Sequence, residues 1–393
     1  MFHVFSLYAL ILAVYLCASL IFPLPLAKRW KALLCIPLLL AALKNEVLYF
    51  FGGPMFFAPE LPGWFLITLS IAFNILLMLF FLTLTKDLVL TVLWIVNRFR
   101  GGKVPFFRHP ATVSAGIAVL ASFLGVWGTV SALLVPEVRE ETLAIPTLPD
   151  GLNGLRVAIL ADIHCSAVNR EAYVREVTTR TNALKPDLIL LLGDLVDGTP
   201  EQRERDLLPL KALKAEYGIF GVPGNHEYYS GYDNWMKLFR SWGFVMLENS
   251  GEELRINGAS LYIAGVTNRA APRFRKEGPD AAKALKDCPA NAVTFLLDHQ
   301  PGTAAENAKQ PFTVQFSGHT HGGMILGIDR WFIARFNGGF VSGWYDLGDS
   351  RLYVSRGTGL WNGFIFRLGV PPEITLLTLK KQPIFYMREA ESL

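Results

Sequence analysis

Five short motifs that combine histidine with carboxylates lie between residues 162 and 321, and they contain five of the chain's seven histidines. In chain order they are Asp162-Ile163-His164, Gly193-Asp194-Leu195-Val196-Asp197, Gly224-Asn225-His226-Glu227, Asp298-His299 and Gly318-His319-Thr320-His321. Carboxylates and imidazoles bind Mn, Fe or Zn ions, and a shared Asp can hold two ions ~3.5–4 Å apart. Such a pair lowers the pKa of a bridging water and holds both the attacking and the leaving oxygen of a phosphoryl group. The motifs therefore predict a two-metal hydrolase.

Each of the five motifs directly follows an apolar run that is typical of a buried strand. Strands are expected at residues 155–161, 187–192, 218–223, 260–266, 292–297, 313–317, 352–355 and 375–379. Helical periodicity over residues 170–184 and 201–216 separates the first three runs. This alternation predicts a layered α/β fold, in which ligands collect beyond the carboxyl ends of the strands. Glycines before Asp194, Asn225 and His319 would let the backbone turn sharply there.

The order D-x-H, G-D-x-x-D, G-N-H-E, a lone His and G-H-x-H resembles the calcineurin-like metallophosphoesterase superfamily, over roughly residues 153–380. Residues 318–323, 353–359 and 372–375 resemble a bacterial branch of it that is membrane-attached or exported. The resemblance implies an α/β domain built as a four-layer αββα sandwich. It also implies a metal-dependent phosphoesterase.

The resemblance implies two divalent metal ions with one carboxylate shared between them. The first ion would be held by Asp162, His164 and His321, the second by Asn225, His299 and His319, and Asp194 would bridge the two. All seven positions carry the expected residue type, so the site is expected to be complete. The ions are expected to be Mn²⁺, with Fe or Zn as alternatives for the same ligands.

Four further residues near the motifs have roles that are less fixed. The resemblance implies that His226 stabilises the transferring phosphoryl group and protonates the leaving oxygen. Asp197 and Glu227 either orient the metal ligands or cap helices, because acidic residues are favoured near helix N-termini. Cys165 is either a packed thiol or a soft ligand, and packing is the simpler interpretation.

Two segments are candidates for substrate recognition. Arg269 and Arg273, with Arg275 and Lys276, form a basic loop that either contacts an anionic headgroup or second phosphate, or is simply solvated. Residues 328–345 are rich in aromatic side chains and suit a membrane interface, a pocket wall or ordinary core.

The composition places part of this chain in lipid. Its 393 residues are 52% hydrophobic and 18% charged, against an average of about 25% charged. The excess of apolar residues lies in residues 1–135, where spans are expected at 2–22, 32–51, 64–83 and 111–135. Residues 88–99 either extend the third span or lie along the interface. The net charge of +4 is small and argues against nucleic-acid binding.

The second span contains Lys44 and Glu46. They either lie at headgroup level on a short or tilted helix, which is the simpler hypothesis, or mark a polar site within the membrane. Basic residues follow the first span and separate the third from the fourth: Lys28, Arg29, Lys31, then Lys86, Arg98, Arg100, Lys103 and Arg108. The positive-inside rule puts both loops in the cytoplasm. With four spans, the residues from 136 onward lie on the extracytoplasmic side of a bacterial inner membrane, and a miscounted span would reverse this.

These patterns divide the chain into a transmembrane domain (residues 1–135), a proline-containing linker (136–152) and a metallophosphoesterase domain (153–393). They predict hydrolysis of a phosphodiester or pyrophosphate bond by in-line attack of a metal-bridging hydroxide. The expected substrate is lipid- or nucleotide-linked, because four spans exceed what anchoring requires and some superfamily members cleave a UDP-linked lipid A precursor. A phosphomonoesterase or broad phosphodiesterase is the alternative enzyme. A membrane sensor or scaffold with a structural metal site is the alternative from another class.

Overall fold

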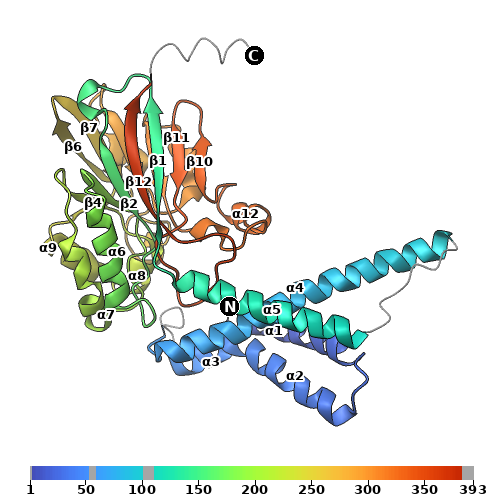
Figure 1. The fold of residues 1–393 in the computed structure, drawn as a ribbon. Coiled ribbons are helices and arrows are strands. Elements are labelled where there is room, and N and C mark those ends of the chain that lie inside the picture. The colour runs from blue at the N-terminus through green and yellow to red at the C-terminus, as the bar shows by residue number, and fades with distance from the viewer. Residues whose placement is uncertain (1, 53–58, 101–109, 383–393) are drawn as a thin grey trace. The chain divides into compact units, whose positions relative to one another are not determined.

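The computed structural model describes residues 2–52, 59–100 and 110–382, and its internal contacts divide the chain into two units (Figure 1). The helical unit comprises Met1–Ala132 and the short segment Asn362–Leu368. The α/β unit comprises Leu133–Trp361 and Gly369–Leu393. A stretch of the C-terminal half therefore belongs to the helical unit, which the sequence did not predict.

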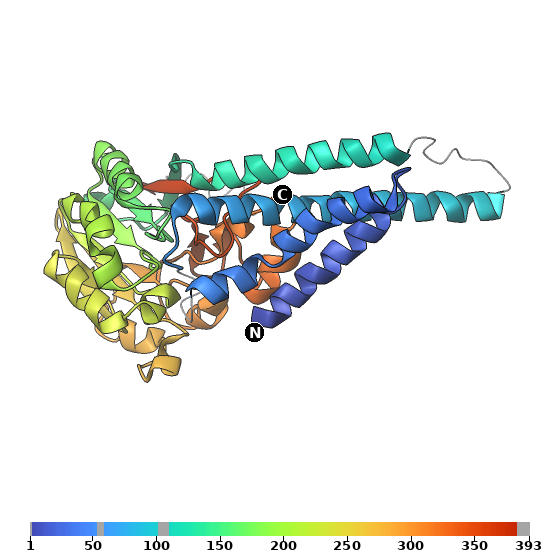
Figure 2. The same ribbon diagram turned by 90° about the horizontal axis from the view of Figure 1, so that it is seen from below.

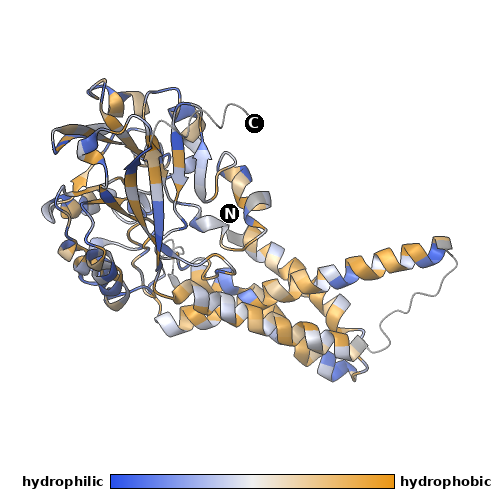
Figure 3. Cartoon of the chain, turned by 45° about the horizontal axis from the view of Figure 1, so that its top comes forward, coloured by the Kyte–Doolittle hydropathy of each residue, from blue (hydrophilic) through white to orange (hydrophobic). Residues whose placement is uncertain are grey.

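The helical unit consists of apolar helices, which appear orange in Figure 3. They are α1 (Phe2–Leu16, continued as a π-helical turn over Cys17–Ile21), α2 (Lys28–Ala42), α3 (Lys44–Gly52), α4 (Gly63–Arg100) and α5 (Pro110–Leu133). Three stretches, Val4–Ile21, Gly63–Phe99 and Ala111–Leu133, are long and apolar enough to cross a membrane. Helices α2 and α3 meet at a 48° bend and would together make a fourth span.

Helix α4 is much longer than a single span requires. Its 38 residues correspond to roughly 57 Å, against a hydrocarbon core of ~30 Å. Residues 88–99 continue the helix of the third expected span without a break, and Figure 2 shows α4 reaching beyond the other helices. Lys103 and Arg108, which were used to predict orientation, lie outside the described residues.

Lys44 is buried within the helical unit, which the sequence did not predict. It begins α3 just after the bend, and only 1% of its surface is exposed. Its ammonium donates a hydrogen bond to the carbonyl of Gly363, at 2.8 Å. The bend directs this side chain into the helical unit, a placement that spacing along the sequence could not predict.

The α/β unit contains two six-stranded sheets. The first has the order β1 (Glu137–Ile145), β12 (Glu373–Lys381), β2 (Arg156–Leu160), β3 (Leu188–Leu191), β4 (Ile219–Gly221) and β5 (Val245–Met246). The second has the order β10 (Gly343–Asp346), β11 (Arg351–Val354), β9 (Val314–Ser317), β8 (Val293–Leu297), β7 (Ala259–Gly265) and β6 (Ser250–Ile256). Strands β2 to β5 are parallel, as are β7, β8, β9 and β11.

The two sheets pack face to face, with helices on their outer faces. Alternate side chains of β2 divide between two cores: Val157 and Ile159 face the second sheet, whereas Ala158 and Leu160 face helices. Because both faces are covered, the strand is apolar throughout. The first sheet is covered by α6 (Glu171–Ala183), α7 (Pro200–Leu207) and α9 (Tyr232–Ser241), and the second by α10 (Ala281–Leu285) and α11 (Ala304–Asn307). This is the αββα sandwich that was expected.

All eight predicted runs form strands whose ends lie within two residues of the prediction. The linker prediction is wrong for residues 137–145, which form β1 and pair along their whole length with β12. The sequence lacks a clear strand pattern there because β1 lies at the edge of its sheet. It buries only Leu143 and Ile145, and its other positions carry mostly charged side chains. The helix expected over 201–216 ends at Leu207, because Pro209 cannot continue it and a 3₁₀ turn follows.

Candidate metal centre

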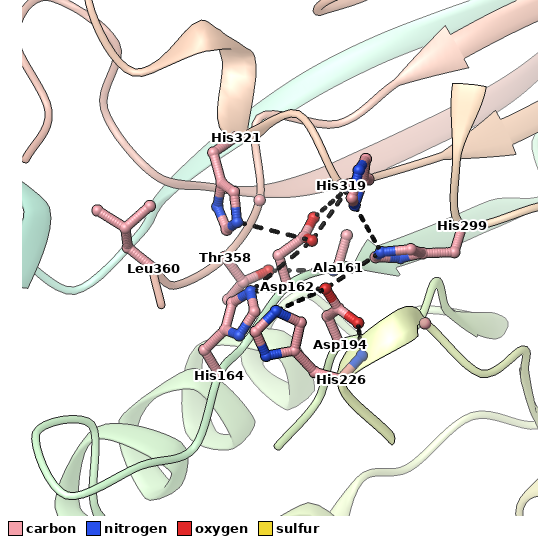
Figure 4. A network of polar contacts seen from close by, with 12 residues as sticks. Ala161, Asp162, His164, Asp194, His226, His299, His319, His321, Thr358 and Leu360 are labelled. Carbon is pink, nitrogen blue, oxygen red and sulfur yellow. Dashed lines mark hydrogen bonds and ion pairs between the residues drawn. The ribbon is translucent and has the colours of Figure 1, made fainter. Parts of the chain in front are cut away.

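The motif side chains gather where strands of both sheets end. Figure 4 shows Asp162 after β2, Asp194 after β3, His299 after β8 and His319 after β9 pointing toward one another. His164, His226 and His321 complete the group from the loops that follow. Parallel strands present their carboxyl ends at one edge, and stacking the two sheets brings both edges together. The convergence predicted from the sequence is therefore present.

The first group of candidate ligands is Asp162, His164 and His321. Their ligand atoms all lie within 4.8 Å of one another. The Asp162 Oδ1 atom is 4.0 Å from His164 Nε2 and 3.9 Å from His321 Nε2. Two atoms that each bind a common ion at ~2.0–2.2 Å have separations of this size. The three residues are almost completely buried, so water does not screen the carboxylate.

The second group is Asp194, His299 and His319, which also have ligand atoms within 4.8 Å. His299 Nε2 lies 3.1 Å from Asp194 Oδ2 and 3.2 Å from His319 Nδ1. Asp194 Oδ2 is also 3.8 Å from His164 Nε2 of the first group. Asp194 thus stands between the two groups, at the position expected of a bridging ligand.

Two buried atoms test whether metal ions fit this site. Among the described residues, His164 Nε2 and Asn225 Oδ1 have no hydrogen-bond partner. Buried polar atoms are usually satisfied, and these two atoms, unlike other unsatisfied atoms such as Ser350 Oγ, belong to the predicted ligand set. His164 is a predicted ligand of the first ion, and Asn225 is one of the second. The donor set therefore fits two divalent cations.

Asp197 fixes the orientation of two imidazoles. Its Oδ1 atom accepts hydrogen bonds from Nδ1 of His164, at 3.0 Å, and from Nδ1 of His226, at 2.6 Å. The Nε2 atoms of both rings are therefore left to face the centre. Thr199, not Asp197, caps the following helix α7, so the orienting role is the one that the geometry supports.

Glu227 ties two of the motif loops together. Its carboxylate accepts hydrogen bonds from the backbone N–H groups of Asp194 (2.9 Å), Leu195 (2.6 Å) and Gly224 (2.7 Å). The last of these also closes a capping box at the start of α8 (Asn225–Tyr229). Both interpretations of this residue therefore hold: one side chain caps the helix and positions the loop of the bridging aspartate.

The carboxylates impose a strong negative potential on the site. Burial alone would lower the pKa of His226, but attraction to Asp194 and Asp197 outweighs burial and raises it to about 9. For His299, burial is likewise outweighed by Asp194, and the pKa rises to about 10. Burial and the nearby His299 lower the pKa of His319 to about 3. The site therefore demands positive charge, which two divalent cations supply.

The backbone turns sharply at the candidate ligands themselves. Positive φ angles occur at Asp162 (54°), His164 (46°), Asp194 (51°), His319 (70°) and His321 (50°). Side chains other than glycine rarely adopt this left-handed conformation, which costs of order 1–3 kcal/mol each. Strain of this kind persists where the surrounding structure enforces it, and it is concentrated here where five side chains must converge.

The glycines have a different role from the one expected. Gly193 does turn the chain, with φ +86°, but Gly224 and Gly318 have no positive φ. A Cβ atom at Gly224 would lie 2.1 Å from Asp194 Oδ1, and one at Gly318 would lie 2.5 Å from Asp162 Oδ2. These two glycines let neighbouring strands approach the aspartates closely.

The loop after β11 lines the centre, although none of its residues belongs to the predicted ligand set. The N–H of Thr358 donates to the Ala161 carbonyl at 2.7 Å, and that of Gly359 to the Asp162 carbonyl at 2.9 Å. The ring of Trp361 lies 6.4 Å from that of His226. The run Arg356-Gly-Thr-Gly359 was the available signal, since closely spaced glycines indicate close backbone approach.

The predicted substrate residues lie on the exposed basic loop. Arg273 is close enough to Tyr229 to influence its pKa, and the Tyr229 ring is 5.5 Å from that of His226. Arg269 is also exposed, whereas Lys276 forms an ion pair with Asp233 at 2.6 Å. The structure thus brings Arg273 to the border of the site, whereas Arg269 lies beside Gly302, with Nη1 3.5 Å from the position that a Cβ atom would take there.

The aromatic segment after His321 divides into two parts. Trp331, Phe332 and Phe336 are 77%, 59% and 70% exposed, so they are not core residues. Trp344, in contrast, packs against the core between the sheets. Core packing, one of the three arrangements expected for residues 328–345, therefore applies to Trp344 and not to these three exposed rings.

Comparison with known proteins identifies the family that this chain resembles. The profile of the calcineurin-like phosphoesterase family matches residues 155–323. An uncharacterized metallophosphoesterase of Campylobacter jejuni is 33% identical over 304 residues, which are 77% of this chain and 78% of that protein. A Bos taurus transmembrane protein with a metallophosphoesterase domain is 31% identical over 72% of this chain and 66% of its own length. A solved dimetal phosphatase from Danio rerio aligns over 52% of this chain and 88% of its own, at 12% identity and a TM-score of 0.29.

The chain therefore belongs to the calcineurin-like metallophosphoesterase family. It is a metal-dependent phosphoesterase, and its apolar helices and its similarity to transmembrane relatives make it a membrane protein.

Substitutions at two adjacent residues, His164 and Cys165, distinguish a metal ligand from a packed side chain. His164→Ala is expected to reduce the bound metal from about two ions per chain to about one, because it removes a ligand at one of two sites. Cys165→Ala is expected to retain both ions, because burial raises the pKa of this thiol far above its ordinary value and keeps it from acting as a thiolate. Elemental analysis of Mn²⁺-loaded, desalted protein measures both. Equal metal loss in the two variants would contradict the assignment.

Proposed function

We propose that this chain hydrolyses a phosphodiester or pyrophosphate bond with two divalent metal ions, most simply Mn²⁺. The observation that carries the proposal is the pair of ligand groups that meet at Asp194, with unsatisfied atoms on His164 and Asn225. The proposed ligands are Asp162, His164 and His321 for one ion, Asn225, His299 and His319 for the other, and Asp194 for both. When bound, the ions supply Lewis acidity and a water of lowered pKa.

His226 is suited to donate the proton that the leaving oxygen requires. Its Nδ1 atom donates to Asp197, so the opposite atom, Nε2, faces the centre, 3.9 Å from Asp194 Oδ2. The proton-donor role rests on this geometry, in which Asp197 fixes the ring and leaves Nε2 toward the reacting groups. A cationic imidazole also stabilises charge on the transferring phosphoryl group.

A lipid- or nucleotide-linked substrate is supported by the side chains at the border of the site. Tyr229 and Trp361 have rings within 6.4 Å of His226, and Phe274 lies 5.8 Å from Tyr229 and is 40% exposed. Such rings suit a nucleobase or an acyl chain, and Arg273 suits a second phosphate. The exposed segment that includes Trp331 directly follows the loop of His321, which agrees with a substrate carrying an apolar portion.

A substrate panel tests this proposal with full-length protein in detergent and Mn²⁺. A UDP-linked lipid and bis-p-nitrophenyl phosphate are expected to be hydrolysed with at least about tenfold higher kcat/KM than p-nitrophenyl phosphate, because the aromatic border binds the second substituent. Asp194→Ala is expected to abolish turnover, and Asp287→Ala, on a side chain 75% exposed, is the matched control. A preference for the monoester would instead support the phosphomonoesterase alternative.

The role of His226 is tested by varying the leaving group. His226→Gln is expected to lower kcat by about 10²–10⁴-fold for a diester whose leaving group is an alcohol, because the alkoxide requires a proton. The loss is expected to be much smaller with bis-p-nitrophenyl phosphate, since p-nitrophenolate leaves without one. Metal content must stay at the wild-type level. Equal losses on the two substrates would show that His226 does not act as the proton donor.

We also propose that the α/β unit lies on the extracytoplasmic face of a bacterial inner membrane. The proposal requires α2 and α3 to form one bent span, because three spans would place this unit on the opposite face. Lys286→Cys, at a side chain 66% exposed, in a Cys288→Ser background, is expected to react with an impermeant maleimide added to spheroplasts. Arg29→Cys is expected to react only after lysis. The reverse pattern would contradict the orientation.

A further inference from the structure

The segment Asn362–Leu368 is a loop between β11 and β12 that packs within the helical unit. Its central residues are buried: Ile365, Phe366 and Arg367 are 2%, 0% and 0% exposed. A loop buried among apolar helices must have its backbone polar groups satisfied, since water is not there to do so. The partners of this segment therefore indicate how it is held.

Three helices each form one hydrogen bond with the backbone of the segment. Lys44 at the start of α3 donates from Nζ to the Gly363 carbonyl at 2.8 Å. Asn74 of α4 donates from Nδ2 to the Ile365 carbonyl at 2.8 Å. The Gly128 carbonyl of α5 accepts from the Arg367 N–H at 2.8 Å. The segment is thus fixed at three points along its length.

The two side-chain donors are themselves buried in the helical unit. Lys44 is 1% exposed, and its ammonium lies 5.0 Å from the centre of the Phe73 ring. Asn74 is fully buried and also donates to Thr129 Oγ1 at 2.8 Å, which links α4 to α5. Burying an ammonium among apolar helices is costly, so polar side chains in such places are usually functional. Neither residue belongs to the metal centre.

Helix α5 provides space for the segment at Gly128. A Cβ atom at this position would lie 2.2 Å from the ring of Phe366, which is fully buried. On the same helix, a Cβ at Gly116 would meet no atom within 4 Å. Absence of a side chain at Gly128 is therefore a requirement of the packed segment and not of the helix.

The residues that directly precede the segment line the metal centre. Thr358 and Gly359 donate backbone hydrogen bonds to Ala161 and Asp162, and Trp361 lies beside His226. One peptide bond joins Trp361 to Asn362. Trp361 therefore lies between two held stretches of backbone, residues 358–359 and Asn362–Leu368. If the hydrogen bonds to Asn362–Leu368 are lost, Trp361 is restrained from the N-terminal side alone.

We propose that Lys44, Asn74 and Gly128 are positioning residues for the active site. By holding Asn362–Leu368, the helical unit fixes the loop that places Trp361 beside His226 and the backbone of residues 358–359 beside Asp162. The helices then serve catalysis as well as attachment to the membrane. This inference goes beyond the proposed function and holds whichever phosphoester is the substrate.

The most direct test compares Gly128→Ala with Gly116→Ala in full-length protein in nanodiscs. Gly128→Ala is expected to lower kcat by about 10- to 100-fold for a diester whose leaving group is an alcohol, because a displaced Trp361 no longer borders His226, the proposed proton donor. KM is expected to rise as well, because Trp361 also borders the proposed substrate. The metal content is expected to change little, and Gly116→Ala is expected to match the wild type. Wild-type kcat in Gly128→Ala would contradict the proposal.

A second comparison keeps both glycines and changes the buried ammonium. Lys44→Met is expected to lower kcat as Gly128→Ala does, Lys44→Arg to restore most of it, and Lys28→Met, at an exposed lysine of α2, to have no effect. Trypsin provides a readout that does not depend on hydrolysis: cleavage after the buried Arg367 is expected to accelerate at least about tenfold in Gly128→Ala and Lys44→Met, because local opening exposes the bond. Wild-type resistance in both variants would overturn the proposal, even if the substrate panel shows no turnover.

Discussion

The burial of negative charge at Asp162 and Asp194 is the constraint on which the site depends. Both carboxylates are almost completely removed from water, and buried charge is tolerated only when it is paired or binds a metal. The pKa values of His226 and His299 rise well above their ordinary value because, despite burial, the carboxylates attract positive charge. Two divalent cations at this edge of the sandwich meet the same demand, and the fold is arranged to hold their ligands in place.

Two layers of structure keep those ligands in place. Asp197 and Glu227 hold imidazoles and backbone by hydrogen bonds, and the surrounding strands enforce left-handed backbone at the ligands themselves. The loop after β11 closes the remaining side and continues into the helical unit. Because the ligands are strained and their charges are buried, small displacements of the supporting groups are expected to affect chemistry more than binding.

The sequence predicted the site well because motif chemistry and strand patterning are local properties. Apolar runs located eight strands, and the parallel arrangement brought their polar ends together. It missed β1, whose charged residues conceal two buried ones. It also did not predict the burial of Lys44, because the bend between α2 and α3 and the distant Gly363 carbonyl leave no local signal. The positive φ angles at Asp162 and Asp194 were likewise hidden, since tertiary contacts impose them against residue preference.

The central claim is that two ions share Asp194, and anomalous X-ray scattering from crystals of the Mn²⁺-loaded protein tests it most directly. Two peaks ~3.5–4 Å apart are predicted, one among Asp162, His164 and His321 and the other among Asn225, His299 and His319. Asp194 should lie between them. A single peak, or two peaks that do not both contact Asp194, would contradict the account.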